Sequence, residues 1–283
     1  MKPIDIVKTV VYKSITQKVE RKRRCPKGYG LLRIIRLLLY AVLMEIFSTR
    51  KLVKHLKKRK KVWKGLGFKK MPSKRSIDEW KKKYEKELSQ VIKLAGNRYL
   101  QLNESQWTIL DSTPIPDYDD EEALTGHSSM GEFVGFKLHV SCDEFCVPLR
   151  AEFTNANVHD SKKAHELLAP TPRVGGDPAY DFKELKESVK RQGSKGTFVH
   201  NPRREGKEAK KPTPKILKKV RICVEQCNSV LKLEVMREYW TRIKGYAKKA
   251  VFALTAVLAL QAVAISNLIE WGYPSIRISE GRA

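Results

Sequence analysis

Three carboxylates stand at positions where metal-dependent phosphoryl chemistry could take place. Asp111 ends the run QWTILD, Asp177 ends VGGD, and Glu225 lies in the basic segment LKKVRICVEQCNSVLK. Acids at strand ends can converge at one edge of a sheet, where they repel each other unless a cation holds them. Mg²⁺, with Mn²⁺ as its substitute, is the natural cation because both prefer oxygen ligands. Two such ions can activate a water or a 3′-hydroxyl and stabilise the departing oxygen.

The spacing around Glu225 bears on its role. Helical steps predict one polar stripe at Arg221, Glu225, Asn228 and Lys232. They predict a stripe facing the core at Val220, Cys223, Cys227 and Val230. Glu225 would then lie between two cations, which suits a metal and a DNA phosphate at once. Spacing alone, however, favours an ordinary surface ion pair with Arg221.

The elements that must position these acids form a mixed α/β pattern. Strands are expected at 106–111, 133–143 and 146–156, the last two joined as a hairpin. Helices at 159–168 and 181–192 then alternate with strands at 173–177 and 196–200. Helices at 215–236 and 240–270 follow. This order indicates an α/β domain.

The first hundred residues are predicted to be helical and strongly basic. Apolar spacing predicts a helix over 31–48 and a second one to Lys61, with Thr49 as a candidate N-cap. Residues 76–94 look like a third helix, opened by Ser76 with Glu79 in a capping-box pattern. The cationic run 54–64 lies among them. Several short basic helices favour contact with DNA phosphates over a merely solvated face.

The charge of the whole chain supports an anionic partner. The chain has 57 Lys and Arg against 31 Asp and Glu, a net charge of +26 over 283 residues. A polyanion relieves such self-repulsion, so nucleic acid is the first partner to consider and an anionic membrane surface the second. Five cysteines, an odd number, with no apolar signal region in residues 1–24, predict a reducing, cytoplasmic setting.

Residues 250–269, AVFALTAVLALQAVAISNLI, are long and apolar enough to span a membrane. Ala is abundant in the segment, and Gln261, Ser266 and Asn267 interrupt it. A buried core helix is therefore the favoured interpretation, and no membrane partner is expected.

Five motifs in order carry a family resemblance. They are ILDSTPI at 109–115, GFKLHV at 135–140, NANVHDS at 155–161, GGDPAYD at 175–181, and the spacing of Arg221, Glu225 and Lys232. Together they resemble the DDE transposases of bacterial and archaeal insertion sequences, whose catalytic domain is RNase H-like. The Tyr that the family has three residues before the Arg is replaced by Lys218.

The resemblance implies roles for individual residues. The metal ligands and catalytic acids would be Asp111, Asp177 and Glu225. Residues that would contact DNA are Arg221, Lys232, Lys137, His139, Arg203 and Arg204. Lys137 and His139 share one strand face, so they line the cleft or His139 is simply a half-buried histidine. Asp160 is interpreted as a helix N-cap rather than a ligand, and Tyr180 either contacts the site or packs.

The resemblance also implies an organisation and a reaction. Residues 1–104 would form a helical, basic DNA-binding region, and residues 105–283 an RNase H-like DDE catalytic domain. The reaction would be Mg²⁺-dependent cleavage of double-stranded DNA at the element ends, then transfer of the 3′-hydroxyl ends to target DNA. Since two ends must be paired, a homodimer or a higher assembly on DNA is expected.

Three other functions compete with this one. Cys142, Cys146, Cys223 and Cys227 supply two pairs with metal-ligand spacing, so a zinc-stabilised DNA-binding protein is one alternative. A domesticated relative that only binds DNA is the second. A plain metal-dependent nuclease on the same fold is the third.

Overall fold

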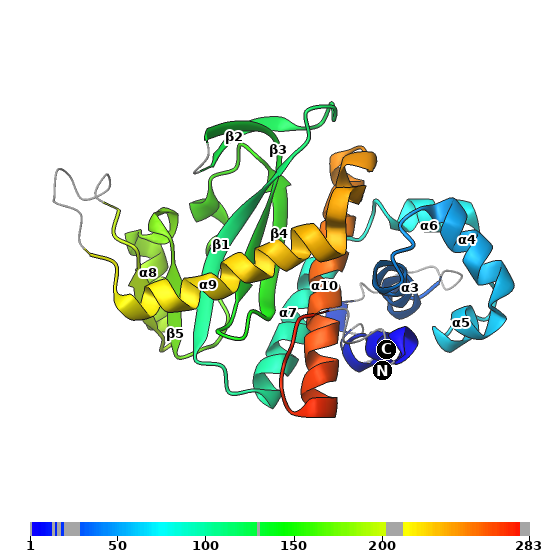
Figure 1. Cartoon of the computed structure of the whole chain (residues 1–283), viewed down its shortest axis with the longest axis horizontal. Coiled ribbons are helices and arrows are strands. Elements are labelled where there is room, and N and C mark those ends of the chain that lie inside the picture. The colour runs from blue at the N-terminus through cyan, green and yellow to red at the C-terminus, as the bar shows by residue number, and fades with distance from the viewer. Residues whose placement is uncertain are drawn as a thin grey trace. The chain divides into compact units, whose positions relative to one another are not determined.

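The computed structural model describes residues 2–12, 15, 18–19, 29–128, 131–201 and 212–277. The chain divides into two compact units: Met1–Ala95 together with Leu231–Ala283, and Gly96–Val230. The first unit is built from helices, whereas the second holds a mixed sheet flanked by helices (Figure 1). The prediction of a mixed α/β protein with a helical N-terminal region is confirmed at this level.

The sheet of the Gly96–Val230 unit mixes antiparallel and parallel pairing. β1 (Trp107–Pro116), β3 (Gly131–Cys142) and β4 (Pro148–Asn155) are antiparallel neighbours, with β3 in the middle. β5 (Arg173–Gly176) runs parallel to β1, and β6 (Lys195–Phe198) runs parallel to β5. β2 (Leu124–Ser128) pairs with the first residues of β3. The parallel part of the sheet therefore begins at β1, which is the strand that carries Asp111.

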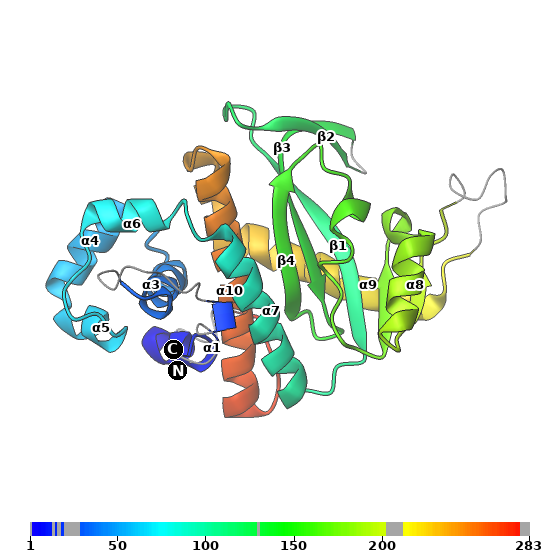
Figure 2. The ribbon, with the colours of Figure 1, turned by 180° about the vertical axis from the view of Figure 1, so that it is seen from behind.

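Helices cover both faces of this sheet. α9 (Lys215–Val230) crosses one face and α8 (Lys183–Arg191) lies on the other, as the two opposite views show (Figures 1 and 2). Successive residues of β5 face opposite sides, so Val174 packs toward α8 while Gly175 faces Leu217 of α9. The core on the α8 side consists of Leu110, Ala164, Leu167, Val174, Tyr180, Leu185 and Val189.

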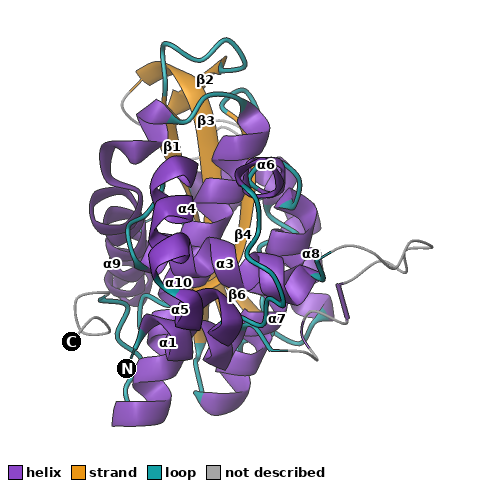
Figure 3. Ribbon diagram, turned by 90° about the vertical axis from the view of Figure 1, so that its right-hand side faces the viewer, coloured by secondary structure: helices purple, strands orange, loops and turns teal. Residues whose placement is uncertain are grey.

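The other unit is helical in its described part (Figure 3). Its elements are α1 (Pro3–Val10), α3 (Leu31–Leu43), α4 (Thr49–Lys58), α5 (Lys60–Gly65), α6 (Lys74–Trp80), the first half of α7 (Glu85–Leu102), a π-helical segment (Leu231–Met236), a 3₁₀ segment (Arg237–Arg242) and α10 (Tyr246–Trp271). α10 packs against α1 and α3, and Gln261 donates a hydrogen bond to the carbonyl of Ile92 at 3.0 Å. The C-terminal helix thus completes the core that the N-terminal helices begin.

α10 passes the length and composition test for a membrane span. However, 89% of its most apolar stretch is buried inside the protein. Its polar residues Gln261, Ser266 and Asn267 are buried as well, and Asn267 donates to the carbonyl of Ser275 at 2.9 Å. The prediction of a buried core helix is confirmed.

Several local predictions were wrong in instructive ways. α6 begins after an N-cap at Ser73, whose hydroxyl accepts from the Ser76 amide at 3.1 Å, and it ends near Lys81 rather than continuing to residue 94. Ser48, not Thr49, caps α4. Residues 159–168 form only a 3₁₀ turn (Asp160–Lys163) followed by turns, and His159 rather than Asp160 is its N-cap. Local propensity did not resolve which of two adjacent polar residues would accept the capping bond.

The compact units do not coincide with the predicted boundary at residue 105. The boundary by compactness lies within α7, between Ala95 and Gly96, and residues 231–283 join the N-terminal segment. Where the DNA-binding region ends and the catalytic domain begins stays a prediction.

Candidate active site

The pairing of β1 with β5 places two of the three predicted acids side by side. Leu110 is the register partner of Gly176 in this parallel pair, so Asp111 and Asp177 are the next positions on neighbouring strands. Such partners share one face of a sheet. Asp177 is further held by its Oδ1 atom, which accepts from the Ala179 amide at 2.9 Å. Strand register therefore fixes both carboxyls.

The two glycines before Asp177 make this placement possible. A Cβ on Gly175 would lie 2.7 Å from Cδ1 of Leu217, and one on Gly176 would lie 3.0 Å from the ring of Tyr180. Both distances are shorter than a normal contact, so a larger residue at either position would require Leu217 or the Tyr180 ring to shift. The GGD sequence thus brings α9 close to the sheet at Gly175, two residues before the acid, and the Tyr180 ring close at Gly176.

Burial makes the two carboxyls reluctant to ionise, and the charge of Asp177 adds to this effect on Asp111. Burial raises the pKa of Asp111 to about 7; the negative charge of Asp177 adds to the shift, and the charge of Arg221 opposes it. Burial likewise raises the pKa of Asp177, again with Arg221 in opposition. A divalent cation would relieve this repulsion, so these two residues fit a hard metal ion.

The face of α9 that approaches the acids differs from the predicted one. Asn228 was expected on the polar stripe beside Glu225, yet it is buried and its Nδ2 atom donates to Asp111 Oδ2 at 2.9 Å. The buried face consists of Leu217, Val224, Cys227 and Asn228. The sequence prediction was wrong because a polar residue at this helical position can face either solvent or a buried carboxylate, and the spacing along the helix is the same in both cases.

Glu225 lies on the solvated side of the same helix. Its side chain is 63% exposed and its Oε1 atom is 4.0 Å from Arg221 Nη2. Over the described ranges, no group of three or more His, Cys, Asp or Glu side chains is arranged to hold a metal ion. The structure therefore brings Asp111 and Asp177 together and leaves Glu225 apart from them.

Asp160 is the acid whose position sequence reasoning missed. Its carboxylate is 3.2 Å from Lys137 Nζ. Its charge raises the pKa of both Asp111 and Asp177, although burial is the larger cause of each shift. A carboxylate within electrostatic reach of the pair thus comes from the turn after β4. The NANVHDS motif was the available signal, but Asp160 was interpreted there as a helix cap.

The side chains of Lys137 and His139 lie on the face of the sheet opposite to the one that carries Asp111. The register pairs Asp111 with Val140 and Ser112 with His139, so His139 and Asp111 point to opposite sides. His139 is fully buried, its Nε2 atom is 2.9 Å from Thr154 Oγ1, and burial lowers its pKa to about 4. Burial thus favours the neutral imidazole against the opposing charge of Asp160, whose carboxylate lies 3.7 Å from Nδ1, and this agrees with the buried-histidine interpretation. A DNA contact by either residue stays untested.

The remaining predicted DNA contacts have no measured geometry. Arg203 and Arg204 lie outside the described residues. Lys232 is half-buried in the π-helical segment and belongs to the other compact unit. Tyr180 is buried against the strand, which agrees with the packing interpretation.

The cysteines give no support to the zinc alternative. The four that the structure describes are free thiols, with Cys142 and Cys227 buried. The thiols of Cys146 and Cys223 donate instead to Gln226 Oε1 and to the carbonyl of Glu144, each at 3.1 Å. These contacts join α9 to the β3–β4 turn.

Comparison with protein-family models gives one match. Residues 119–244 match the transposase DDE domain, a segment shorter than half of the chain. The matched segment includes Asp177 and Glu225, whereas Asp111 precedes it. No curated protein and no solved structure matches the chain. The resemblance to DDE-type transposases, which was drawn from the five motifs, is confirmed by the family match.

Proposed function

Because residues 119–244 match the transposase DDE domain, we propose that the protein cuts DNA at the ends of an insertion sequence and transfers the freed 3′-hydroxyl ends to target DNA. One observation carries the proposal. Asp111 on β1 and Asp177 directly after β5 both follow the last register pair of these parallel strands, Leu110 and Gly176, and a divalent cation would relieve their repulsion.

The sheet supports an RNase H-like fold for this domain. Three antiparallel strands, β4, β3 and β1, are followed by β5 and β6 parallel to β1. The first acid is on β1 and the second directly follows β5, which is the neighbouring strand. This order gives the two strand-borne acids of the DDE set a common edge.

Asp111, Asp177 and Glu225 are the residues proposed to hold Mg²⁺, or Mn²⁺ in its place. When bound, such ions supply Lewis-acid activation of the attacking water or 3′-hydroxyl and stabilise the departing oxygen. The two strand acids already fit this task. Glu225 has to come closer than it lies here, because its side chain is largely solvated.

The neighbouring residues position the acids and the DNA. Asn228 orients the Asp111 carboxyl through its side-chain amide, which donates to Oδ2. The Arg221 guanidinium acts on both strand acids, and it is only partly exposed, so it is suited to hold a phosphate beside them. Lys232, which belongs to the helical unit, is proposed as a further phosphate contact on the family resemblance alone.

The helical unit is proposed to bind the DNA backbone. α4 buries Leu52 and Leu56 and leaves its lysines in solvent. Exposed cations continue across the α4–α5 junction at Lys57, Lys58, Arg59, Lys60, Lys61 and Lys64. Binding through such a surface weakens steeply with salt, because phosphate neutralisation releases counterions.

Cleavage of a supercoiled plasmid that carries the element's flanking DNA tests the proposal. Wild type and Asp177→Asn would be compared with Mg²⁺ and with EDTA, with Asp5→Asn, an exposed aspartate of α1, as the matched control. Cleavage by wild type and Asp5→Asn alone, abolished by EDTA, is the expected result. Cleavage that survives EDTA or the Asp177 change would overturn the carboxylate mechanism.

The products distinguish the alternatives. Joining of the 3′-hydroxyl ends to a second plasmid is expected of a transposase, whereas a plain nuclease leaves only cut ends. If wild type binds the DNA with strong salt dependence and never cuts it, the protein is a DNA-binding relative without catalysis.

A further inference from the structure

The turn between β1 and β2 concentrates negative charge in a chain of net charge +26. Residues 117–122 read DYDDEE, so five of these six positions are acidic. Tyr118 is 72% exposed at this turn, and Asp119 and Glu121 beside it are exposed as well. Carboxylates repel DNA phosphates, so this turn is unsuited to the DNA contacts proposed for the rest of the protein. An exposed aromatic ring among acids instead fits a cationic, partly apolar partner.

Two buried aspartates give the turn a fixed shape. Asp117 and Asp120 are almost fully buried. Asp117 Oδ1 accepts from the Asp119 amide at 3.2 Å, and Asp120 Oδ1 accepts from the Glu122 amide at 3.1 Å. Because these side chains fold back on the backbone, the exposed Tyr118, Asp119 and Glu121 are presented at the surface with little ordering left to do on binding.

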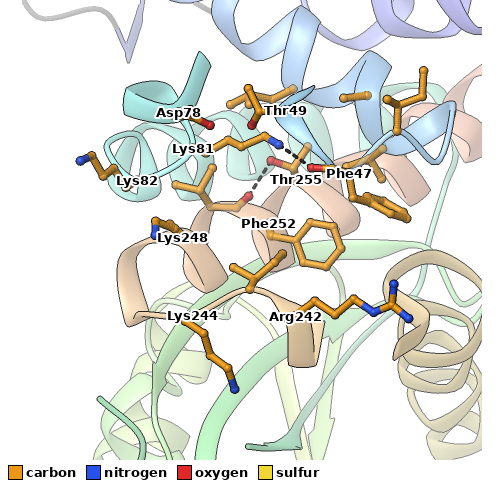
Figure 4. Close-up of a pocket in the computed structure, with 16 residues that line it drawn as sticks. Phe47, Thr49, Asp78, Lys81, Lys82, Arg242, Lys244, Lys248, Phe252 and Thr255 are labelled. Carbon is orange, nitrogen blue, oxygen red and sulfur yellow. Dashed lines mark hydrogen bonds between the residues drawn. The ribbon is translucent and has the colours of Figure 1, made fainter. Parts of the chain in front are cut away.

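The helical unit contains a pocket of the complementary kind (Figure 4). It has a volume of about 460 Å³, which is in the range that accepts an aromatic group with its neighbours. Apolar side chains from α3 and α10 form one part of its wall, including Leu38, Val42, Val251 and Phe252. Phe252 meets Phe47 edge-on with ring centroids 5.2 Å apart, so part of the wall is aromatic.

Cations outnumber acids around this pocket. Its lining includes Lys81, Lys82, Arg242, Lys244 and Lys248, against the single acid Asp78. Lys81 Nζ donates to the carbonyl of Phe47 at 2.5 Å, and burial lowers the pKa of Lys81 to about 8. An incoming carboxylate would favour its charged form. The pocket therefore suits an aromatic ring that arrives together with negative charge.

We propose that the acidic turn of one copy of this chain docks into the pocket of a second copy, with Tyr118 against the aromatic wall and Asp119 and Glu121 facing the cations. In a two-fold dimer the contact occurs twice, since each copy offers both a turn and a pocket. A single small contact of this kind is weak alone, and its duplication in the dimer strengthens the association. Complementarity favours this occupant: the turn offers an exposed ring with negative charges, and the pocket offers an aromatic wall with positive charges.

Sedimentation equilibrium of the full chain without DNA or divalent cation tests this inference, so its failure is separate from any failure of the proposed catalysis. Tyr118→Ala is expected to weaken self-association at least tenfold. Trp271→Ala removes a similarly exposed aromatic, 73% exposed, from outside the turn and the pocket, and is expected to change nothing. Equal association by the two variants would overturn the proposal.

Charge reversal provides the sharper test. Lys248→Glu and Glu121→Lys should each weaken self-association at least tenfold, because every contact then sets like charges together. Mixing the two variants should restore it, since the mixed dimer contains one native contact and one reversed pair.

Three results would contradict the proposal. The first is a mixture no stronger than its components. The second is restoration only when both changes are in one chain, which would mean that the turn docks within its own copy. The third is a loss of DNA affinity by Lys248→Glu with self-association unchanged, which would mean that DNA occupies the pocket.

Discussion

The two strand-borne acids and the helix-borne acid are held in different ways. The positions of Asp111 and Asp177 follow from the register of β1 and β5, and both residues are partly buried. Glu225 is largely solvated on α9, where its contact is a 4.0 Å pair with Arg221. Three residues further along the helix, Asn228 occupies the place beside Asp111. Hydrogen-bonded strands fix a carboxyl, whereas a helix places it according to the rotation about its axis.

This difference between the strand acids and Glu225 suggests that the site is completed in two stages, first by folding and then by binding. The strand pair is assembled by folding, at the cost of burying two carboxyls whose pKa values are both raised by burial. Positions three residues apart on a helix differ by about 60° around the axis. Glu225 is therefore one small rotation of α9, or one side-chain reorientation, from the face that holds Asn228. In the proposed mechanism that last step is completed on binding metal and DNA.

The largest expected effect is on the strand pair. Asp177→Asn should reduce plasmid cleavage by about 10³-fold or more, because groups that act as a unit fail together. Measured by initial cleavage rate, Asp5→Asn should match wild type. Retention of more than a tenth of the activity in Asp177→Asn would remove this carboxyl from the chemistry.

The second effect concerns the helix acid. Glu225→Gln should lower the cleavage rate by about 10²-fold or more, with the melting temperature unchanged, because an exposed side chain contributes little to stability. Glu187→Gln, a similarly exposed glutamate of α8, is the control and should retain full activity. If Asp160→Asn abolishes cleavage of a stably folded protein while Glu225→Gln does not, the third acid is Asp160.

The third effect is on the scaffold. Gly175→Val should destabilise the protein by about 1–3 kcal/mol, because the new side chain overlaps Leu217 and pushes α9 from the sheet. Denaturant unfolding measures this change. Gly131→Ala is the contrasting substitution with open space around it, where a strained backbone angle is the sole cost. An unchanged midpoint for Gly175→Val would mean that α9 adjusts without loss.

The smallest effect is a pH dependence of stability. The pKa of Asp111 in the folded protein, about 7, lies above its ordinary value of 3.8, so the folded state binds more protons between these values. Wild-type stability then falls as pH rises from about 4 to 7. Asp111→Asn keeps an acceptor for Asn228 and lacks this loss. Its melting temperature relative to wild type should therefore rise over that window in EDTA, and a constant difference would contradict the burial of this carboxyl.

Sequence patterns predicted the elements better than their contacts. The hairpin of β3 and β4 and the buried α10 were anticipated, since alternation and continuous apolar runs reflect burial directly. The side of α9 that carries Asn228 was not, because an asparagine reads as polar whether water or a buried carboxyl is its partner. The role of Gly175 was equally hidden, since the side chain that fills its space comes from residue 217.

The division of the chain has a consequence for its synthesis. The helical unit is assembled from Met1–Ala95 and Leu231–Ala283, with the whole sheet unit encoded between them. As the ribosome advances from the N-terminus, the sheet unit emerges complete before α10 does. The N-terminal helices therefore keep their apolar faces uncovered until α10 has been synthesised. Asp111 and Asp177 can thus be brought into register in the sheet unit before the basic N-terminal helices pack against α10.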